Sequence, residues 1–238
     1  MQQQVDTRRE PGHRLRVGDN ELSRDKALLL LQEYAVSNAS TVLVYDLAGD
    51  PEGRPGPDCA ARPVDSVDLA DIGRLVAINA RLAARDPATL TSIDAAAEFA
   101  AVAPDARIEN CEPGSDLYAA ATGLYEKYRL HDGSNIGQAK RSKLLHIKRP
   151  WLVPIADSRS ITAYRQRAGI QAGRPSRHWE AVREDLITGA EHFEWLTAQL
   201  GQHPQPEVQR LGRLTRLRLL DILAWTLGGP EPPGSTGG

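Results

Sequence analysis

Cysteine, aromatic residues and long apolar runs are all scarce in this sequence of 238 residues. Its two cysteines, Cys59 and Cys111, belong to no C-x-x-C pair and to no cluster with histidine. This pattern argues against a disulfide framework, an iron–sulfur cluster and a structural zinc site. The histidines also lack the H-E-x-x-H spacing of a zinc protease. We therefore expect neither a cofactor nor a bound metal.

Apolar residues are scattered along the chain rather than gathered into one run. No stretch approaches the roughly 18 apolar residues that a membrane-spanning helix requires. The opening residues, MQQQVDTRRE, lack the apolar region of a signal peptide. The sequence thus predicts a soluble, cytoplasmic protein with no membrane partner, and it leaves the oligomeric state open. The motifs of P-loop ATPases, Rossmann dehydrogenases and serine hydrolases are missing as well.

Helical periodicity dominates the patterns that are present. Ser23, Asp68 and Ser115 each precede apolar residues at helical spacing and predict helix starts. Thr91 with its capping-box spacing predicts another start. The run 41–47 (TVLVYDL) is β-branched but has no second strand to pair with, so it predicts a buried extended segment. Together these patterns predict an all-α fold.

The later part of the chain predicts three more helices. A short helix follows Gly137 and ends at Pro150, a longer stretch covers 176–196, and the last covers about 207–227. Composition predicts a single helical domain with less ordered parts before and after it. The four predicted parts are a disordered tail over 1–21, a helix, extended segment and Pro/Gly loop over 22–63, the helical domain over 64–227 and a disordered tail over 228–238.

Charge is distributed unevenly along the chain. The formal net charge is −2, yet residues 137–179 contain ten Lys or Arg against one acidic residue, Asp157. A patch of fixed positive charge raises the potential over its own surface, which indicates DNA or another anionic ligand as partner. The alternative is that these side chains cover solvated helix faces or pair with the acidic remainder.

Residues 130–164 carry the most specific pattern. A predicted turn at Asn135-Ile136-Gly137 separates two helices, as in the helix-hairpin-helix motif, in which glycines let backbone amides approach a phosphate. Asn135 stands where that motif has its first glycine, and Asn tolerates a left-handed backbone. The sequence thus predicts a degenerate helix-hairpin-helix segment that contacts nucleic acid through Asn135, Gly137, Lys140, Arg141, Lys143, Lys148, Arg149 and Trp151.

Tryptophans divide into two groups in this pattern. Trp179, Trp195 and Trp225 fall in or beside apolar helix stripes and are assigned to the core. Trp151 instead follows Pro150 amid basic residues, where a wedge against a base is one interpretation and simple packing is the other.

The same segment resembles an uncharacterised bacterial family, found mainly in actinobacteria. That family has a helix-hairpin-helix-like turn followed by the signature K-L-L-x-x-K-R-P-x-L-[IV]-P-[IV]-x-D-S. The C-terminal LTRLRLLDILAW (214–225) also resembles the closing helix of the family. The resemblance implies no known activity. The matching residues are Lys143, Leu144, Leu145, Lys148, Arg149, Pro150, Leu152, Val153, Pro154, Ile155, Asp157 and Ser158.

A more distant resemblance is to helix-hairpin-helix DNA glycosylases, which have a catalytic aspartate about twenty residues after the last hairpin glycine. Here that spacing joins Gly137 to Asp157. The chain departs from the pattern at Ala139, where bifunctional members have a lysine nucleophile, and at Arg141, where a small residue is preferred. Iron–sulfur cysteines are also missing.

Asp157 therefore has three possible roles: an ordinary helix N-cap, a ligand contact, or a catalytic carboxylate that stabilises a cationic sugar-like transition state. Three classes of function stay open with it. They are a DNA-binding protein without catalysis, a monofunctional glycosylase-like enzyme, and a structural or interaction protein in which the basic residues scatter around the molecule.

Overall fold

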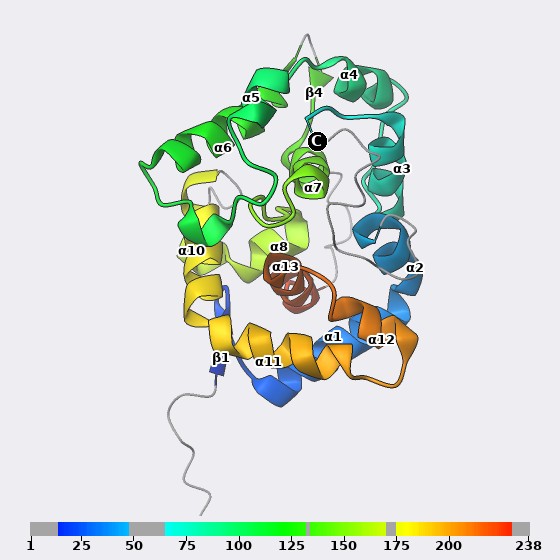
Figure 1. Ribbon diagram of the computed structural model, residues 1–238, viewed down its shortest axis with the longest axis vertical. Coiled ribbons are helices and arrows are strands. Elements are labelled where there is room, and N and C mark those ends of the chain that lie inside the picture. Colours follow the sequence, from blue (N-terminus) through cyan, green and yellow to red (C-terminus); the bar gives the residue numbers. More distant parts are fainter. Residues whose placement is uncertain (1–13, 48–64, 132–133, 170–174, 230–238) are drawn as a thin grey trace, which may run out of the picture.

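The computed structural model describes residues 14–47, 65–131, 134–169 and 175–229, and helices dominate this part of the chain (Figure 1). The prediction of an all-α, single-domain fold is confirmed. The helices are α1 (Arg24–Ser37), α2 (Ala39–Thr41), η1 (Val42–Asp46), α3 (Leu69–Ala77), α4 (Asp86–Ser92), α5 (Ala96–Ala100), η2 (Ile108–Asn110), α6 (Asp116–Lys127), α7 (Gln138–Lys148), α8 (Ser158–Ala163), α9 (Arg165–Ala168), α10 (Pro175–Thr188), α11 (Ala190–Gly201), α12 (Pro206–Leu211) and α13 (Arg216–Leu227).

Two antiparallel β-hairpins complete the described elements. Their strands are β1 (Arg14–Val17), β2 (Asn20–Ser23), β3 (Leu130–His131) and β4 (Ser134–Asn135).

Local capping explains where several helices begin. Ser23, Asp68 and Ser115 cap α1, α3 and α6, each accepting a hydrogen bond from a backbone N–H of the first turn. These three predicted starts are confirmed. The start predicted at Thr91 is wrong, because Thr91 lies inside α4 and the next helix begins at Ala96.

The run 41–47 is helical rather than extended, so its prediction is wrong. The chain continues from α1 through α2 into η1, a π-helical segment. This geometry buries Val42 and Tyr45 on one side, and Tyr45 Oη donates a 2.7 Å hydrogen bond to the carbonyl oxygen of Lys143. Tertiary packing thus overrides the β-propensity of a run that has no strand to pair with.

Two predicted long helices are each broken at a glycine. The stretch 176–196 divides at Gly189 into α10 and α11, and the stretch 207–227 divides after Gly212 into α12 and α13. A Cβ at position 212 would lie 2.6 Å from the backbone nitrogen of Gly201. The missing side chain therefore lets the ends of α11 and α12 approach closely.

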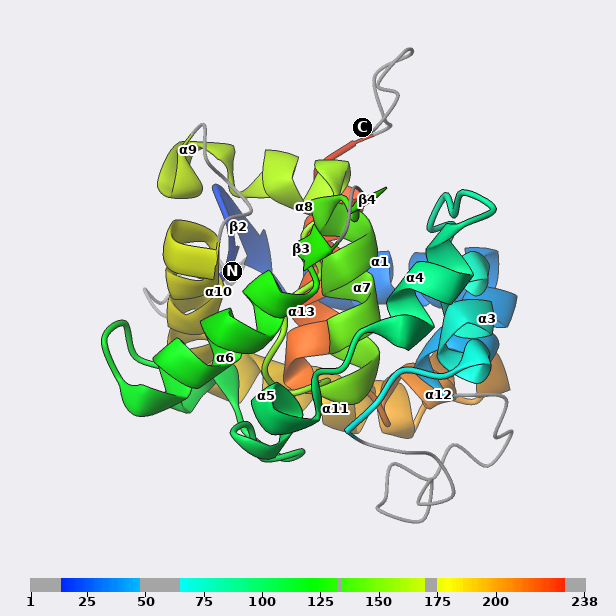
Figure 2. The same cartoon turned by 90° about the horizontal axis from the view of Figure 1, so that it is seen from above.

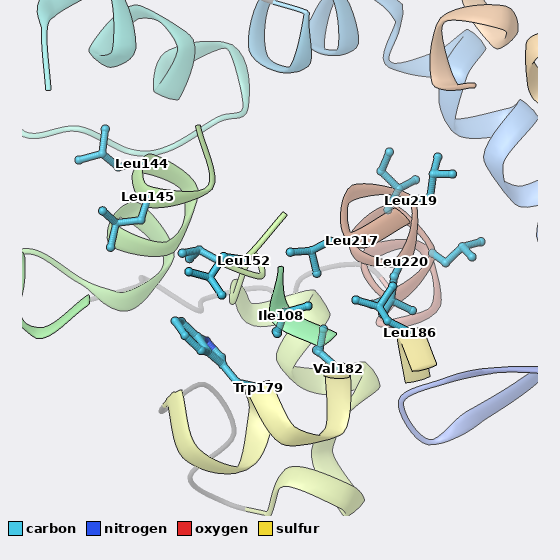
Figure 3. Close-up of a cluster of buried hydrophobic side chains, with 14 of the residues drawn as sticks. Ile108, Leu144, Leu145, Leu152, Trp179, Val182, Leu186, Leu217, Leu219 and Leu220 are labelled. Carbon is cyan, nitrogen blue, oxygen red and sulfur yellow. The ribbon is translucent and has the colours of Figure 1, made fainter. Parts of the chain in front are cut away.

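The core is built around α13. In Figure 1 this helix is seen end-on near the centre, and α1, α8, α10 and α11 all contact it. A helix enclosed in this way is expected to be apolar nearly all round. Figure 3 shows how its side chains meet those of α10 and η2: Leu217, Leu220, Trp179, Val182 and Ile108 all belong to one buried hydrophobic cluster.

The N-terminal hairpin packs onto this core, with Leu15 and Val17 buried. Gly18, in its turn, has φ 61°, and a Cβ there would lie 2.1 Å from the carbonyl oxygen of Ala163. The prediction of a disordered tail over 1–21 is therefore wrong for residues 14–21. Residues 1–13, the Pro/Gly loop up to residue 63 and residues 230–238 lie outside the described part.

Candidate functional site

The connection that leads into α7 is a β-hairpin. Strands β3 and β4 pair Leu130 with Asn135, on either side of residues 132–133, which lie outside the described part together with the Asn135 side chain. Gly137 precedes α7 with φ −57°, so it does not adopt the left-handed conformation of a tight glycine turn. The backbone therefore differs here from the predicted helix-hairpin-helix turn.

The basic residues at the end of α7 point into the protein. Lys148 Nζ lies 2.5 Å from Asp71 Oδ2 on α3. Arg149 has 0% of its surface exposed, and it donates hydrogen bonds to the carbonyl oxygens of Phe99 (2.9 Å) and Val102 (2.8 Å). Both side chains thus hold other segments against α7.

The basic residues nearer the start of α7 are also engaged inside the protein. Lys140 donates to Asp86 Oδ2 on α4 over 2.8 Å. The Arg141 guanidinium lies 4.1 Å from the centre of the Tyr125 ring on α6, and only 7% of the residue is exposed. The predicted exposed basic surface on α7 is therefore wrong, because other helices pack around α7 and leave few of its positions in solvent. Four residues of that predicted surface are buried: Arg141, Lys143 and Lys148 on α7, and Arg149 directly after it.

Trp151 packs against the segment before η2. Its ring lies 4.7 Å from the guanidinium of Arg107, and its carbonyl oxygen accepts a 2.9 Å hydrogen bond from the backbone N–H of Ile108. The side chain is half-buried. This placement favours the packing interpretation of Trp151 over a wedge against a base.

Asp157 caps α8, as one of its three interpretations predicted. Its Oδ1 accepts a hydrogen bond from the backbone N–H of Ser160 over 3.0 Å, and the Ser160 hydroxyl completes a reciprocal capping box. Its other oxygen, Oδ2, lies 3.6 Å from Lys143 Nζ, which also donates to the carbonyl oxygen of Ile78 over 3.3 Å. One carboxylate thus joins α8 to α7.

Lys143 and Asp157 line a pocket of about 580 Å³. Its wall comes from the start of α7, from α8 and the residues just before it, from α13, from the segment that follows α3, and from α1 and α2. Figure 2 shows α7 and α13 side by side, with α8 near the end where α7 begins. The charged lining consists of the cations Arg81, Lys140, Lys143, Arg159 and Arg218 and the acids Asp157 and Asp221.

Trp225 gives the pocket an aromatic wall. The guanidinium of Arg159 lies 4.0 Å from its ring, and the Tyr34 ring meets it edge-on with 5.7 Å between centroids. Trp225 packs against the hydrophobic core, as its helix stripe predicted, but it is only partly buried and also lines the pocket.

Arg218 and Asp221 also line the pocket, although the sequence did not predict them as site residues. Both interrupt the apolar stripe of α13, three residues apart, and both are buried. Arg218 Nε donates to Asp46 Oδ1 over 2.6 Å, and Asp221 Oδ2 accepts from the backbone N–H of Ile155 over 3.1 Å. Charged residues inside an otherwise apolar helix were the available signal, because a buried charge needs a partner.

Burial sets the protonation of the groups behind the pocket. It raises the pKa of the Asp221 carboxyl well above its usual range, although Arg218 opposes this shift. It lowers the pKa of His146 to about 3, so that ring is neutral near pH 7. His146 Nδ1 therefore carries the hydrogen that bonds the carbonyl oxygen of Val153 over 2.7 Å, because a carbonyl oxygen only accepts.

His178 on α10 is buried with both ring nitrogens lacking hydrogen-bond partners among the described residues. Its ring packs edge-on against Tyr164, with 5.0 Å between centroids. Burial lowers the pKa of His178 to about 4, although the Asp157 carboxylate opposes this shift. The unfolded chain therefore binds a proton at this residue before the folded protein does.

We predict that His178→Phe reduces the loss of stability in acid. The pKa of His178 is about 6.5 in the unfolded chain and about 4 in the folded protein. Between these two values the unfolded chain binds the proton more strongly, so the free energy of unfolding of the wild type falls as pH drops from about 6.5 toward about 4. Removing the histidine lowers the slope of unfolding free energy against pH in this window by up to about 1.4 kcal/mol per pH unit. Urea denaturation of both proteins between pH 7 and pH 4 measures the difference. Equal slopes would contradict a buried neutral His178.

Among the described residues, no three His, Cys, Asp or Glu side chains are grouped so that they could hold a metal ion. In the same part of the chain, no single helix is long and apolar enough to cross a membrane. Only α1 taken together with Ala39–Asp46, across an 83° bend, passes that test of length and composition.

Comparison with known proteins places the chain by family alone. No curated protein and no solved structure matches it. Residues 59–228, which include the whole pocket wall except its contribution from α1 and α2, match the family of unknown function DUF6308. The match covers more than half of the sequence, and the chain is therefore a member of the DUF6308 family.

Proposed function

We propose that the protein binds an anionic ligand of nucleotide size in the pocket lined by Lys143 and Asp157. The observation that carries the proposal is the wall of the pocket, which gathers five cationic side chains and two carboxylates around open volume. Two of these cations, Lys140 and Arg218, also pair with Asp86 and Asp46, which lie outside the wall. Burial raises the pKa of Asp221, which disfavours its charged form. Charges in a partly enclosed site are screened less than charges in open solvent, so the wall attracts an anion.

The volume of the pocket and the aromatic part of its wall restrict the class of ligand further. A volume of about 580 Å³ lies within the range of small-molecule sites. Trp225 and Tyr34 provide aromatic surface at one part of the wall, and aromatic rings favour planar heterocycles. A ligand that combines a phosphate with a planar ring fits both features, and a nucleotide is the simplest such ligand.

Binding along the backbone of duplex DNA is less well supported. Such binding needs cations that reach the phosphates, and Arg141, Lys148 and Arg149 are buried in contacts with neighbouring helices. If the protein has only a structural or interaction role, its cations should be scattered and engaged inside the protein, as these three are. The pocket wall favours ligand binding over that alternative, because it collects cations from separate helices around open volume.

We predict that mononucleotides bind the wild-type protein and that Lys143→Gln weakens this binding at least about tenfold, which corresponds to about 1.4 kcal/mol. The substitution removes one charge from the pocket while keeping a polar side chain of similar length. Calorimetric titration with AMP, GMP, CMP and UMP measures the affinities.

Lys26→Gln is the matched control, since Lys26 is exposed on α1 and outside the pocket wall. It should bind like the wild type. No binding of any nucleotide to the wild type, or equal binding by Lys143→Gln, would contradict the proposal.

Glycosylase-like base release is a second candidate, favoured by one observation. Asp157 lies at the pocket wall, and only Oδ1 is used by the α8 cap while Oδ2 lies beside Lys143. A carboxylate so placed is able to stabilise positive charge that develops on a sugar as a base leaves.

For this candidate we predict that Asp157→Asn abolishes base release from damaged oligonucleotides. Asparagine caps a helix almost as well as aspartate, so the cap of α8 is kept, but Lys143 loses its carboxylate neighbour, and the Tm of the variant is therefore measured beside its activity. Gel analysis of abasic products from a panel of lesions measures the activity. A wild-type protein that releases no base, or an equally active Asp157→Asn, leaves Asp157 as a structural cap.

A further inference from the structure

We propose a second anion site, between α6 and α7, in which Arg141, Gln138 and Tyr125 bind a phosphate group. Arg141 and Tyr125 are not part of the wall of the nucleotide pocket, whereas Gln138, at the start of α7, lines it. The inference rests on the buried donors of Arg141 and Tyr125 and does not require that a nucleotide binds in the pocket.

Arg141 differs from the other buried basic residues of α7. Lys148 and Arg149 reach a carboxylate or carbonyl oxygens. The Nε and Nη1 atoms of Arg141 are buried and have no hydrogen-bond partner among the described residues. The guanidinium lies over the Tyr125 ring in a cation–π contact, and its charge opposes the rise in pKa that burial gives the Tyr125 hydroxyl. A buried cation without an acceptor destabilises a fold, so its presence points to an anion that binds there.

Two further unpartnered donors accompany it. The Gln138 Nε2 and Tyr125 Oη atoms are also buried without hydrogen-bond partners among the described residues. Gln138 precedes Arg141 by three positions and so lies on the same side of α7. Helical side chains lean toward the N-terminus, which brings the Arg141 side chain over the turn that contains Gln138.

The start of α7 adds to the same electrostatic field. Gly137 provides no side-chain cap, so no described side chain caps the first backbone N–H groups of this 11-residue helix. A helix N-terminus carries partial positive charge and favours anions. The donors come from a guanidinium, an amide, a hydroxyl and the helix end. A tetrahedral phosphate has enough oxygens to accept from all of them, and arginine binds such groups in a fork geometry.

The test compares thermal unfolding of the wild type and Arg141→Met in chloride and in inorganic phosphate at equal ionic strength. Methionine keeps apolar length beside Tyr125 but removes the unpaired charge. In chloride, Arg141→Met should have a Tm equal to or above that of the wild type. Phosphate at about a hundredfold above its Kd should raise the wild-type Tm by roughly 5 to 10 °C and leave Arg141→Met unchanged.

Three other variants make the result specific. Tyr125→Phe removes one hydroxyl donor and should retain only part of the phosphate shift. Arg165→Met, on the exposed side of α9, and Lys143→Gln, in the pocket, should both keep the full shift. The site is wrong if phosphate does not stabilise the wild type, or if it stabilises Arg141→Met equally. It is also wrong if the shift is lost in Lys143→Gln alone, a result that assigns the phosphate to the pocket.

Discussion

Helix α7 combines burial with a high positive charge, and the surrounding structure supplies an acceptor for almost every one of its cations. Lys148 pairs with Asp71 on α3, Lys140 pairs with Asp86 on α4, and Lys143 lies beside Asp157 before α8. Removing one member of a buried pair leaves an uncompensated charge, which is strongly destabilising. These contacts therefore determine which segments pack around α7, and they leave the Nε and Nη1 atoms of Arg141 without an acceptor among the described residues.

The pocket follows from the same arrangement. Lys143 and Asp157 form one part of its wall, and α13 forms another, where Arg218 is held by Asp46. Asp221 on the same helix fixes the backbone of Ile155 just before α8. Polar residues on the central helix thus position the cap of α8 and the edge of the pocket, while the leucines between them bury the core. Binding and folding depend on overlapping sets of residues in this region.

Sequence predicted the features that depend on a few neighbouring residues. The caps at Ser23, Asp68 and Ser115 and the cap alternative at Asp157 need only a side chain and the N–H three positions later. The places of the α7 cations were not predictable in this way, because burial depends on helices that are distant in the chain. The helical course of 41–47 has the same cause: its packing against Lys143, through Tyr45, is not visible in the local pattern.

The most direct test of these internal contacts is the salt dependence of binding to a duplex DNA of about 20 base pairs. If the α7 cations are engaged inside the protein, affinity changes little between about 50 and 200 mM salt, with a slope of log K against log salt shallower than about −1. Each phosphate contact contributes about −0.9 to that slope. A slope near −4.5, as five contacts would produce, that becomes shallower in Lys143→Gln would show that the α7 cations face DNA and would contradict the account.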